Sequence, residues 1–592
     1  MQPFTYEDLS LALAGNDMEK LKEARKNCRA ILKNKPNDSA FLHLMAIIEF
    51  KFGHIDAASE CIKKAIAISP NSAELYCNYA KMLASRKKYA DAVIAFRRSI
   101  ALKPDFAPAF YGLGTVFKES GDDSNAIKAY NDALGIDPNY PEVLNNLGLI
   151  LKEKGELAGA INCYDRAIVA RPEYPMPLNN LGVVWFSLGQ VDAAECLFRR
   201  ALALQPDNPD TLNNLGSIPL HHGRFEESMV FFKKALTLRP EHPDALNNLG
   251  NALKNIGKMP EAIAAYEQAI AIKPDCPDYH NNLAMAFLAC GRFIEGWRDY
   301  EWRWKTAQFS GIRQNATKPL WKGEKAQGRI VLVRAEQGFG DTIQFCRYAP
   351  LASAYGLRVL MEVQQPLVKI MGSLAGVECV VAQGLSLPEH DFYCPMMSLP
   401  LAFNTRLETI PAHVPYLSAE HDSVIKWKKH FLIGADKRLN VGLAWAGKPR
   451  IQSPDLIAAD RRRSMSAELL ARIMDIPGVR FYSLQKDGPP APREFGLIDL
   501  MFECGDFADT AALIANLDLV ISVDTAIAHL AGALGKPVWL LNRFDSCWRW
   551  LRDRQDSPWY PTMRVFHQPS PGDWKSVMSS VSDELRKIIT KM

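Results

Sequence analysis

Small, aromatic and proline residues recur through the first half of the chain with a period of 34 residues. This pattern predicts two antiparallel helices in each period. Small side chains are needed where helix axes approach, aromatic rings fill the wider gaps, and proline ends the second helix. The recurring positions are Ala58, Ala92, Ala126, Ala160, Ala194, Ser228 and Ala262, the aromatic residues Phe96, Tyr130, Tyr164, Phe198, Phe232 and Tyr266, and the prolines Pro70, Pro104, Pro138, Pro172, Pro206, Pro240 and Pro274.

A single helix pair cannot bury its apolar face, so such pairs stack into a superhelix. The period and the residue types are those of the tetratricopeptide repeat. They predict an α-solenoid over residues 1–304, with eight units from about residue 39 and an irregular capping unit at residues 5–38. A solenoid of this kind offers an extended surface for holding another polypeptide.

A pair of asparagines recurs in the first helix of five successive units. Asparagine is a mediocre helix former, so its repetition needs a reason. The second residue of each pair is expected to face the groove, where its carboxamide can pair with the backbone of an extended acceptor peptide. The alternative is that these amides bond to neighbouring repeats and hold the stack together. The predicted acceptor-binding residues are Asn146, Asn180, Asn214, Asn248 and Asn282. The ladder resembles the tetratricopeptide part of eukaryotic protein O-GlcNAc transferases, which implies an acceptor chain in the groove.

After residue 300 the pattern changes to alternating short apolar strands and helices. Such alternation predicts parallel sheets covered on both faces. Two series of strands, separated by a charged helical stretch at about residues 418–437, suggest two Rossmann-like lobes facing a cleft, the GT-B plan of glycosyltransferases. The predicted fold class is therefore α plus α/β. The predicted parts are the solenoid at 1–304, a linker at 305–328, a first (acceptor-side) lobe at 329–420 and a second (donor) lobe at 438–592.

The first strand, predicted from Ile330, leads into a turn that contains Gly338, Gly340 and Asp341. Ligands of open parallel sheets bind beyond the carboxyl ends of the strands, and glycines let a backbone approach them closely. Asp341 is well placed there to take a proton from an incoming hydroxyl. Its structural alternative is an N-cap of the following helix.

A later buried strand ends in Asp524, Thr525 and Ala526, and His529 follows one turn into the next helix. Helix N-termini with bare amides hold phosphates, so these four residues are predicted to bind a phosphate group. His529 has a structural alternative as a satisfied core histidine.

Two further strand exits carry polar and basic residues. Cations that converge on a cleft would neutralise a phosphate leaving group. The candidates are Lys448, Arg463, Gln485 and Lys486, while Arg461 and Arg462 could equally form a solvated face.

Bulk composition narrows the function class. The net charge of +4 is small for 592 residues and argues against nucleic acid as the main ligand. No apolar run is long enough for a transmembrane helix, and the first residues do not resemble a signal peptide. Twelve cysteines without CxxC pairs favour a reducing cytoplasm, and no metal site or bound cofactor is expected.

Residues 329–545 resemble the GT9, heptosyltransferase-like glycosyltransferases, on the turn at Asp341 and on Val523-Asp524-Thr525 with His529. The resemblance implies that Asp341 is the general base and that Asp524, Thr525, Ala526 and His529 hold the donor. Arg463 stands where the family carries a phosphate-contacting lysine.

The whole chain looks like bacterial tetratricopeptide glycosyltransferases, including those that modify flagellin. The leading hypothesis is an inverting, metal-independent transferase that moves a sugar from a nucleotide sugar to Ser or Thr of a protein in the groove. Flagellin is one candidate acceptor. The alternatives are a non-catalytic scaffold, favoured by a short first lobe, and a transferase acting on lipid-linked or surface polysaccharide.

Overall fold

The computed structural model describes residues 18–306, 309, 318–431, 438–448, 454–552 and 554–591. The chain forms two compact units, Met1–Pro206 and Asp207–Met592. The predicted boundary between solenoid and lobes lay at residue 304, where the sequence pattern changes. The compact units divide earlier, because the repeats after Asp207 share a hydrophobic core with the lobes.

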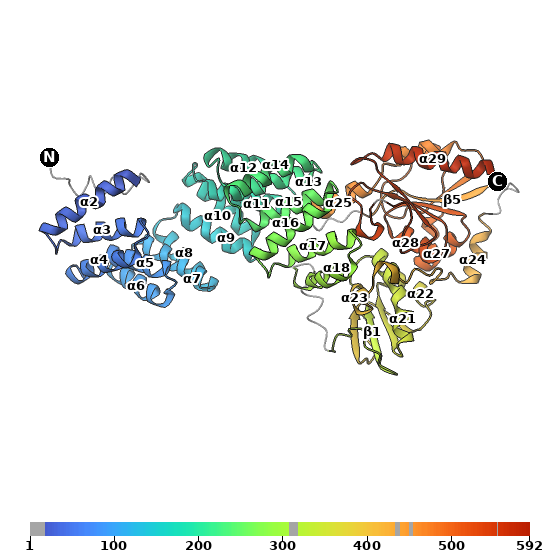
Figure 1. The fold of residues 1–592 in the computed structure, drawn as a ribbon, viewed down its shortest axis with the longest axis horizontal. Coiled ribbons are helices and arrows are strands. Elements are labelled where there is room, and N and C mark those ends of the chain that lie inside the picture. Colours follow the sequence, from blue (N-terminus) through green and yellow to red (C-terminus); the bar gives the residue numbers. More distant parts are fainter. Residues whose placement is uncertain are drawn as a thin grey trace. The chain divides into compact units, whose positions relative to one another are not determined.

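The helices of the solenoid run in antiparallel pairs from residue 39 to residue 300, as the 34-residue period predicts (Figure 1). The predicted capping unit at residues 5–38 is described only from Met18, and its earlier part lies outside the described residues. In the first unit the helices are α2 (Met18–Asn34), α3 (Ser39–Lys51), α4 (Ile55–Ile68), α5 (Ala73–Ser85), α6 (Tyr89–Leu102), α7 (Ala107–Glu119), α8 (Asp123–Ile136), α9 (Pro141–Glu153), α10 (Leu157–Ala170), α11 (Pro175–Ser187) and α12 (Val191–Leu204). In the second unit they are α13 (Pro209–His221), α14 (Phe225–Leu238), α15 (Pro243–Asn255), α16 (Met259–Ile272), α17 (Pro277–Ala289) and α18 (Phe293–Tyr300).

The recurring aromatics fill the space between paired helices, as predicted. Tyr164 is fully buried, and a Cβ atom added at Gly148 would lie 2.7 Å from its ring. Gly250 faces Tyr266 in the same way, at 2.6 Å. The first helix therefore keeps glycine where the aromatic ring of the second helix lies against its backbone.

The first lobe is a four-stranded parallel sheet in the order β3-β2-β1-β4. The first strand begins at Ile330, as predicted, and the alternation of strands and helices predicted after it is present. Its elements are β1 (Ile330–Arg334), α20 (Phe339–Phe345), α21 (Ala349–Ala354), β2 (Arg358–Val363), α22 (Val368–Met371), β3 (Val377–Ala382), β4 (Phe392–Pro395) and α23 (Leu399–Ala402).

The described part of the predicted linker belongs to this lobe. Leu320 pairs with Tyr393 beside β4, and Trp321 is buried in the core. The prediction of a free linker over 305–328 is therefore wrong for residues 318–328, because this stretch has no periodicity that would have revealed its packing.

The second lobe is a six-stranded parallel sheet in the order β10-β9-β8-β5-β6-β7. The short strand β7 and the strand β10 were not predicted. The elements from the lobe junction onward are α24 (His421–Lys428), β5 (Leu439–Ala444), α25 (Pro454–Arg463), α26 (Ala471–Met474), β6 (Val479–Ser483), β7 (Ile498–Asp499), α27 (Phe507–Ala515), β8 (Leu519–Val523), α28 (Ala526–Ala533), β9 (Val538–Asn542), β10 (Met563–His567) and α29 (Trp574–Lys591).

Helices cover both faces of this sheet, as expected for parallel strands (Figure 1). Helix α29 covers one face, while α27 and α28 pack on the other. The core beneath α27 and α28 continues into the first lobe and into the last repeats, where it includes Leu288, Phe293 and Trp297. The last repeats and both lobes are thus one packed body.

Candidate functional site

Asp341 lies in the first turn of α20, just beyond the carboxyl end of β1. Its Oδ2 atom accepts a hydrogen bond of 3.1 Å from the backbone N–H of Gly338, the N-cap residue. The carboxylate therefore satisfies one of the free amides at the helix start. Asp341 is not the N-cap residue that the structural alternative proposed, but its side chain does cap the helix start through this bond.

The same carboxylate is paired across the lobes with Arg549. The Oδ1 atom of Asp341 accepts from Nη2 of Arg549, and Nε of Arg549 donates to Oε1 of Gln344 at 2.8 Å. Asp341 keeps 24% of its side chain exposed. Its carboxylate is thus oriented by two partners and still reaches solvent.

The helix that carries Asp341 lies directly against the helix predicted to bind the donor. A Cβ atom added at Gly340 would lie 2.8 Å from Cδ2 of His529 and 3.7 Å from Cα of Ala526. Only glycine allows α20 and α28 to approach this closely. The acidic turn of the first lobe therefore faces this helix of the second lobe.

The start of α28 is partly open to solvent. Asp524, Thr525 and Ala526 are half-buried, and Thr525 is the N-cap residue without a side-chain capping bond. The hydroxyl of Thr525 lies 3.0 Å from that of Ser522. The helix start therefore meets the solvent beside Gly340, where an anion could reach its amides.

His529 is a buried and satisfied histidine, as its structural alternative proposed. Its Nδ1 atom lies 2.9 Å from the hydroxyl of Tyr560, and its ring stacks on Trp550 with centroids 5.2 Å apart. Burial lowers the pKa of His529 to about 4, so the imidazole is neutral at neutral pH. Its Nε2 atom lies 3.8 Å from Oδ1 of Asp524, too far for a hydrogen bond.

The three cations predicted at the exits of β5 and β6 differ in their surroundings. Arg463 reaches the exit of β5, where its Nη2 atom would lie 2.4 Å from a Cβ atom at Gly447. Lys448 is exposed and lies 3.6 Å from Asp487. Lys486 is exposed and donates to the carbonyl of Cys504 at 2.6 Å.

Gln485 has a structural role instead of the predicted donor contact. Its Oε1 atom accepts from the backbone N–H groups of Trp445 and Ala446, while Nε2 donates to the carbonyls of Ala446 and Asp487. A carboxamide offers two donors and two acceptor sites, and all are used. We therefore remove Gln485 from the proposed donor site.

The asparagine pairs form hydrogen-bonded ladders. Nδ2 of Asn282 donates to Asn247 at 2.9 Å, and Nδ2 of Asn248 donates to Asn213 at 3.0 Å. In the first unit, Nδ2 of Asn180 donates to Asn145 at 2.9 Å. The alternative that these amides tie neighbouring repeats together therefore holds. The second asparagine of each pair is half-buried: Asn146, Asn180, Asn214, Asn248 and Asn282.

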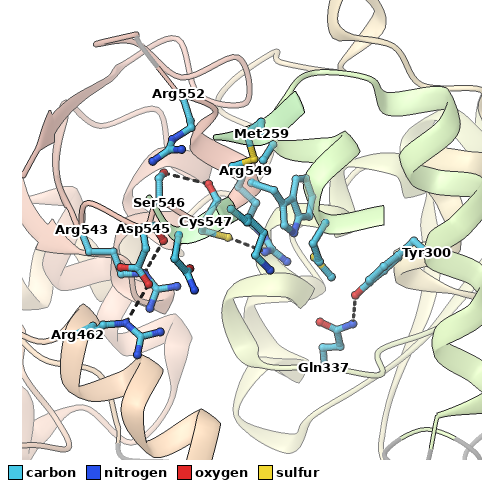
Figure 2. A pocket seen from close by; sticks show the side chains of 15 residues that line it. Met259, Tyr300, Gln337, Arg462, Arg543, Asp545, Ser546, Cys547, Arg549 and Arg552 are labelled. Carbon is cyan, nitrogen blue, oxygen red and sulfur yellow. Dashed lines mark hydrogen bonds and ion pairs between the residues drawn. The ribbon is translucent and has the colours of Figure 1, made fainter. Parts of the chain in front are cut away.

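A pocket of about 350 Å³ lies where the last repeats meet the lobes (Figure 2). The repeats contribute Lys254, Asn255, Met259, Met285, Ala289 and Tyr300, the turn after β1 contributes Gln337, and the second lobe contributes Arg462, Arg543, Asp545, Ser546, Cys547, Trp548, Arg549 and Arg552. Arg549 connects this pocket to Asp341.

Sequence reasoning missed most of this pocket. A detectable signal was the cluster of arginines directly after β9, at positions 543, 549 and 552, which stands at a strand exit. Lys254 carried no such signal, because nothing in a helical repeat marks which exposed lysine will face another domain.

Family comparisons agree with the two-part architecture. Four tetratricopeptide-repeat models match parts of the solenoid, one of them at two places. The model of glycosyltransferase family 9 (heptosyltransferase) matches residues 505–541, which hold Asp524 and His529. The repeat matches cover residues 61–94, 114–155, 145–209, 186–245 and 220–286. The chain thus combines tetratricopeptide repeats with an α/β region that is similar to glycosyltransferase family 9.

Among curated proteins, the chain is similar to Protein FlbA of Caulobacter vibrioides, with 28% identity over 324 residues that cover 49% of this chain and 52% of that protein. The chain thus spans about half the length of this relative. Among solved structures, it is similar to the APC/C hetero-tetramer Cut9–Hcn1 (19% identity, 48% of this chain and 54% of that chain, TM-score 0.40). It is also similar to PilF of Pseudomonas aeruginosa (20% identity, 35% and 94%, TM-score 0.32).

Among the residues that the structure describes, no helix has the length and apolar character needed to cross a membrane. The same residues contain no group of three or more His, Cys, Asp and Glu side chains arranged to hold a metal ion.

Proposed function

We propose that this protein is an inverting glycosyltransferase that moves a sugar from a nucleotide sugar to Ser or Thr of a protein held by the solenoid groove. The observation that carries the proposal is the contact of α20 with α28 at Gly340 and His529. This contact sets the carboxylate of Asp341 beside the half-open helix start at Asp524 to Ala526.

Asp341 would act as the general base. The acceptor hydroxyl oxygen attacks the anomeric carbon of the donor, its proton passes to Asp341, and the bond from the anomeric carbon to the phosphate oxygen breaks with its electron pair on that oxygen. Both oxygens of Asp341 have one partner, and each retains a further lone pair that could take the proton.

The leaving phosphate would be stabilised without metal. The amides at the start of α28 are one source of positive potential. Arg463 at the exit of β5 and the exposed Lys448 and Lys486 are further candidates at the same sheet edge. Nucleotide sugar is thus a co-substrate, no bound cofactor is required, and we assign the reaction to the cytoplasm.

The acceptor would lie along the half-buried asparagines of the ladder, whose carboxamides can donate to and accept from the backbone of an extended chain of any sequence. Flagellin is a candidate acceptor, suggested by the resemblance to flagellin-modifying transferases.

The test is sugar transfer from a panel of UDP-, GDP-, ADP- and CMP-sugars to a lysate of cells that lack this protein, read out by mass spectrometry. Asp341→Asn should lower the transfer rate about 10²- to 10⁴-fold, the usual contribution of a general base. Asp509→Asn is the matched control, because Asp509 makes a similar helix-start bond, to the N–H of Gly505 at 2.9 Å, at the start of α27. Undiminished transfer by Asp341→Asn would remove the assigned base.

A non-catalytic scaffold is the second candidate. It is favoured by the two existing partners of Asp341, Arg549 and Gly338, which restrict access to the carboxylate. Calorimetry separates the two candidates, since a scaffold with a degenerate donor lobe would bind none of the four nucleotides.

A further inference from the structure

The junction pocket has walls from two different parts of the chain. Helices α15 to α18 of the solenoid contribute one side, and Arg462 and the loop after β9 contribute the other. Figure 2 shows Met259 and Tyr300 from the solenoid together with the arginines of the second lobe. Its volume of about 350 Å³ lies within the range of small-molecule sites. A ligand in this pocket would touch the repeats and the donor lobe at once.

Positive charge exceeds negative charge in the lining. It holds five basic side chains, Lys254, Arg462, Arg543, Arg549 and Arg552, and one acid, Asp545. Asp545 accepts from Arg462 at 2.9 Å and lies 3.5 Å from Arg543. Arg549 is paired with Asp341 outside the lining.

Two of these cations have no acidic partner among the described residues. Arg552 donates only to the carbonyl of Phe544, at 3.4 Å, and lies against the turn at Gly257. The ammonium of Lys254 makes no hydrogen bond or ion pair with any residue that the structure describes. Burial lowers the pKa of Lys254 to about 8, with Arg543 and Arg462 acting in the same direction and Asp545 opposing them. A bound anion would compensate this cost.

The asparagine face of the solenoid leads into the same pocket. Asn255 follows Asn248 by seven residues on α15, and Ala289 follows Asn282 by seven on α17. Residues seven apart lie on one face of a helix. The groove face that would carry an acceptor therefore ends at the cationic pocket.

We propose that the junction pocket binds a phosphate-bearing anion and that Lys254, supplied by the solenoid, is one of its direct ligands. This pocket is separate from the proposed donor contacts at the start of α28 and at the exit of β5, because none of those residues lines it. The repeats would therefore do more than hold an acceptor, since they contribute a ligand to this site.

The probe for the pocket is inorganic pyrophosphate, titrated into the full chain by calorimetry, with UDP, GDP, ADP and CMP in parallel. Lys254→Gln should weaken pyrophosphate binding about tenfold or more, as expected for loss of one charge-assisted contact. Lys258→Gln is the matched control, because Lys258 is exposed, lies four residues further along and does not line the pocket. Lys254→Arg should retain binding.

Thermal unfolding without ligand separates a binding role from a structural one. Removing an unpartnered cation from a positively charged pocket should leave the melting temperature of Lys254→Gln unchanged or raised. Should that variant unfold early, Arg552→Gln provides the second measurement, with the same expected loss of binding. A lysine kept for stability would lower the melting temperature and leave pyrophosphate binding intact.

The outcomes separate this inference from the proposed function. If pyrophosphate does not bind, or binds Lys254→Gln as tightly as the unchanged chain, the pocket assignment is wrong even where sugar transfer is found. If pyrophosphate binding depends on Lys254 but no donor supports transfer, the anion pocket stands and the transferase proposal does not.

Discussion

At the scale of single residues, the neutral state of His529 has a measurable consequence. Burial lowers its pKa to about 4 in the folded chain, while an unfolded histidine titrates near 6.5. Above pH 6.5 the residue is neutral in both states and has no effect on the pH dependence of stability. As the pH falls below 6.5, the unfolded chain binds a proton that the folded chain does not, so stability is lost.

The prediction is that the free energy of unfolding drops by about 2 kcal/mol between pH 7 and pH 5 through this one histidine, at 1.36 kcal/mol per pKa unit. Denaturant unfolding of the unchanged chain and of His529→Asn at both pH values measures it. The asparagine variant should lack this part of the loss. Equal pH dependence in the two chains would show that His529 is protonated when folded.

Lys254 has its own expected pH dependence. Because its pKa is about 8, pyrophosphate binding should weaken above that pH as the ammonium loses its proton. Tyr300 and Cys547 also line the pocket beside the arginines and Asp545. The comparison is therefore with Lys254→Arg, which keeps its charge and should bind more tightly than the unchanged chain at pH 9.

At the scale of the helices, the ladder assigns different roles to the two asparagines of a pair. Asn247 is buried, accepts from Asn282 and donates to Asn248. Asn248 is half-buried and donates to Asn213. The first asparagine thus ties neighbouring repeats together. The second does so as well and, in the proposed function, would also contact the acceptor.

Asn247→Ala should therefore destabilise the chain by about 1–3 kcal/mol, the cost of leaving buried partners unsatisfied. Asn248→Ala should cost less stability and should weaken acceptor modification more. Unfolding and the mass-spectrometric transfer assay measure the two effects. The idea of a divided role fails if both variants lose stability and transfer in the same proportion.

The elements that the sequence predicted well are those with strong periodicity. The helix pairs and most strands follow from patterns that any single unit or strand repeats. Trp321 and the stretch around it were taken as linker, because one tryptophan in an irregular segment carries no period. The pocket was missed for a related reason, since Lys254 and Arg552 meet only through packing between elements far apart in the sequence.

The candidate site residues that could be predicted are those that directly follow a strand, because the strand itself is visible in the sequence. Asp341 follows β1, and Asp524 follows β8, so strand exits alone placed both. Gln485 also follows a strand, but its amide, after β6, forms hydrogen bonds with the backbone of Trp445 and Ala446, after β5. Strand-exit reasoning cannot distinguish a polar side chain that faces a ligand from one that binds its own backbone.

At the scale of the whole molecule, the second compact unit begins among the repeats. Trp297 is buried and donates from Nε1 to the carbonyl of Thr405 at 3.2 Å. Arg303 is buried and pairs with Glu336 in the first lobe at 2.8 Å. The last repeats therefore complete the core of the lobes.

A shortened chain that begins at Asp207 should fold, whereas one that begins at Arg329 should not. The shorter chain would expose the core surface that Phe293 and Trp297 cover and leave Glu336 buried without Arg303. Expression, size-exclusion chromatography and thermal unfolding check both. A monomeric, cooperatively folding chain from Arg329 would mean that the last repeats are dispensable for folding.

The shared core also constrains how such a protein can change its length in evolution. Each repeat before Pro206 contacts mainly its neighbours, so whole units there can be gained or lost at little cost. A unit inserted between Lys254 and the lobes would instead move that lysine away from the pocket wall that the second lobe supplies. Relatives should thus differ in the number of their early repeats while retaining the last ones in a constant spacing from the transferase lobes.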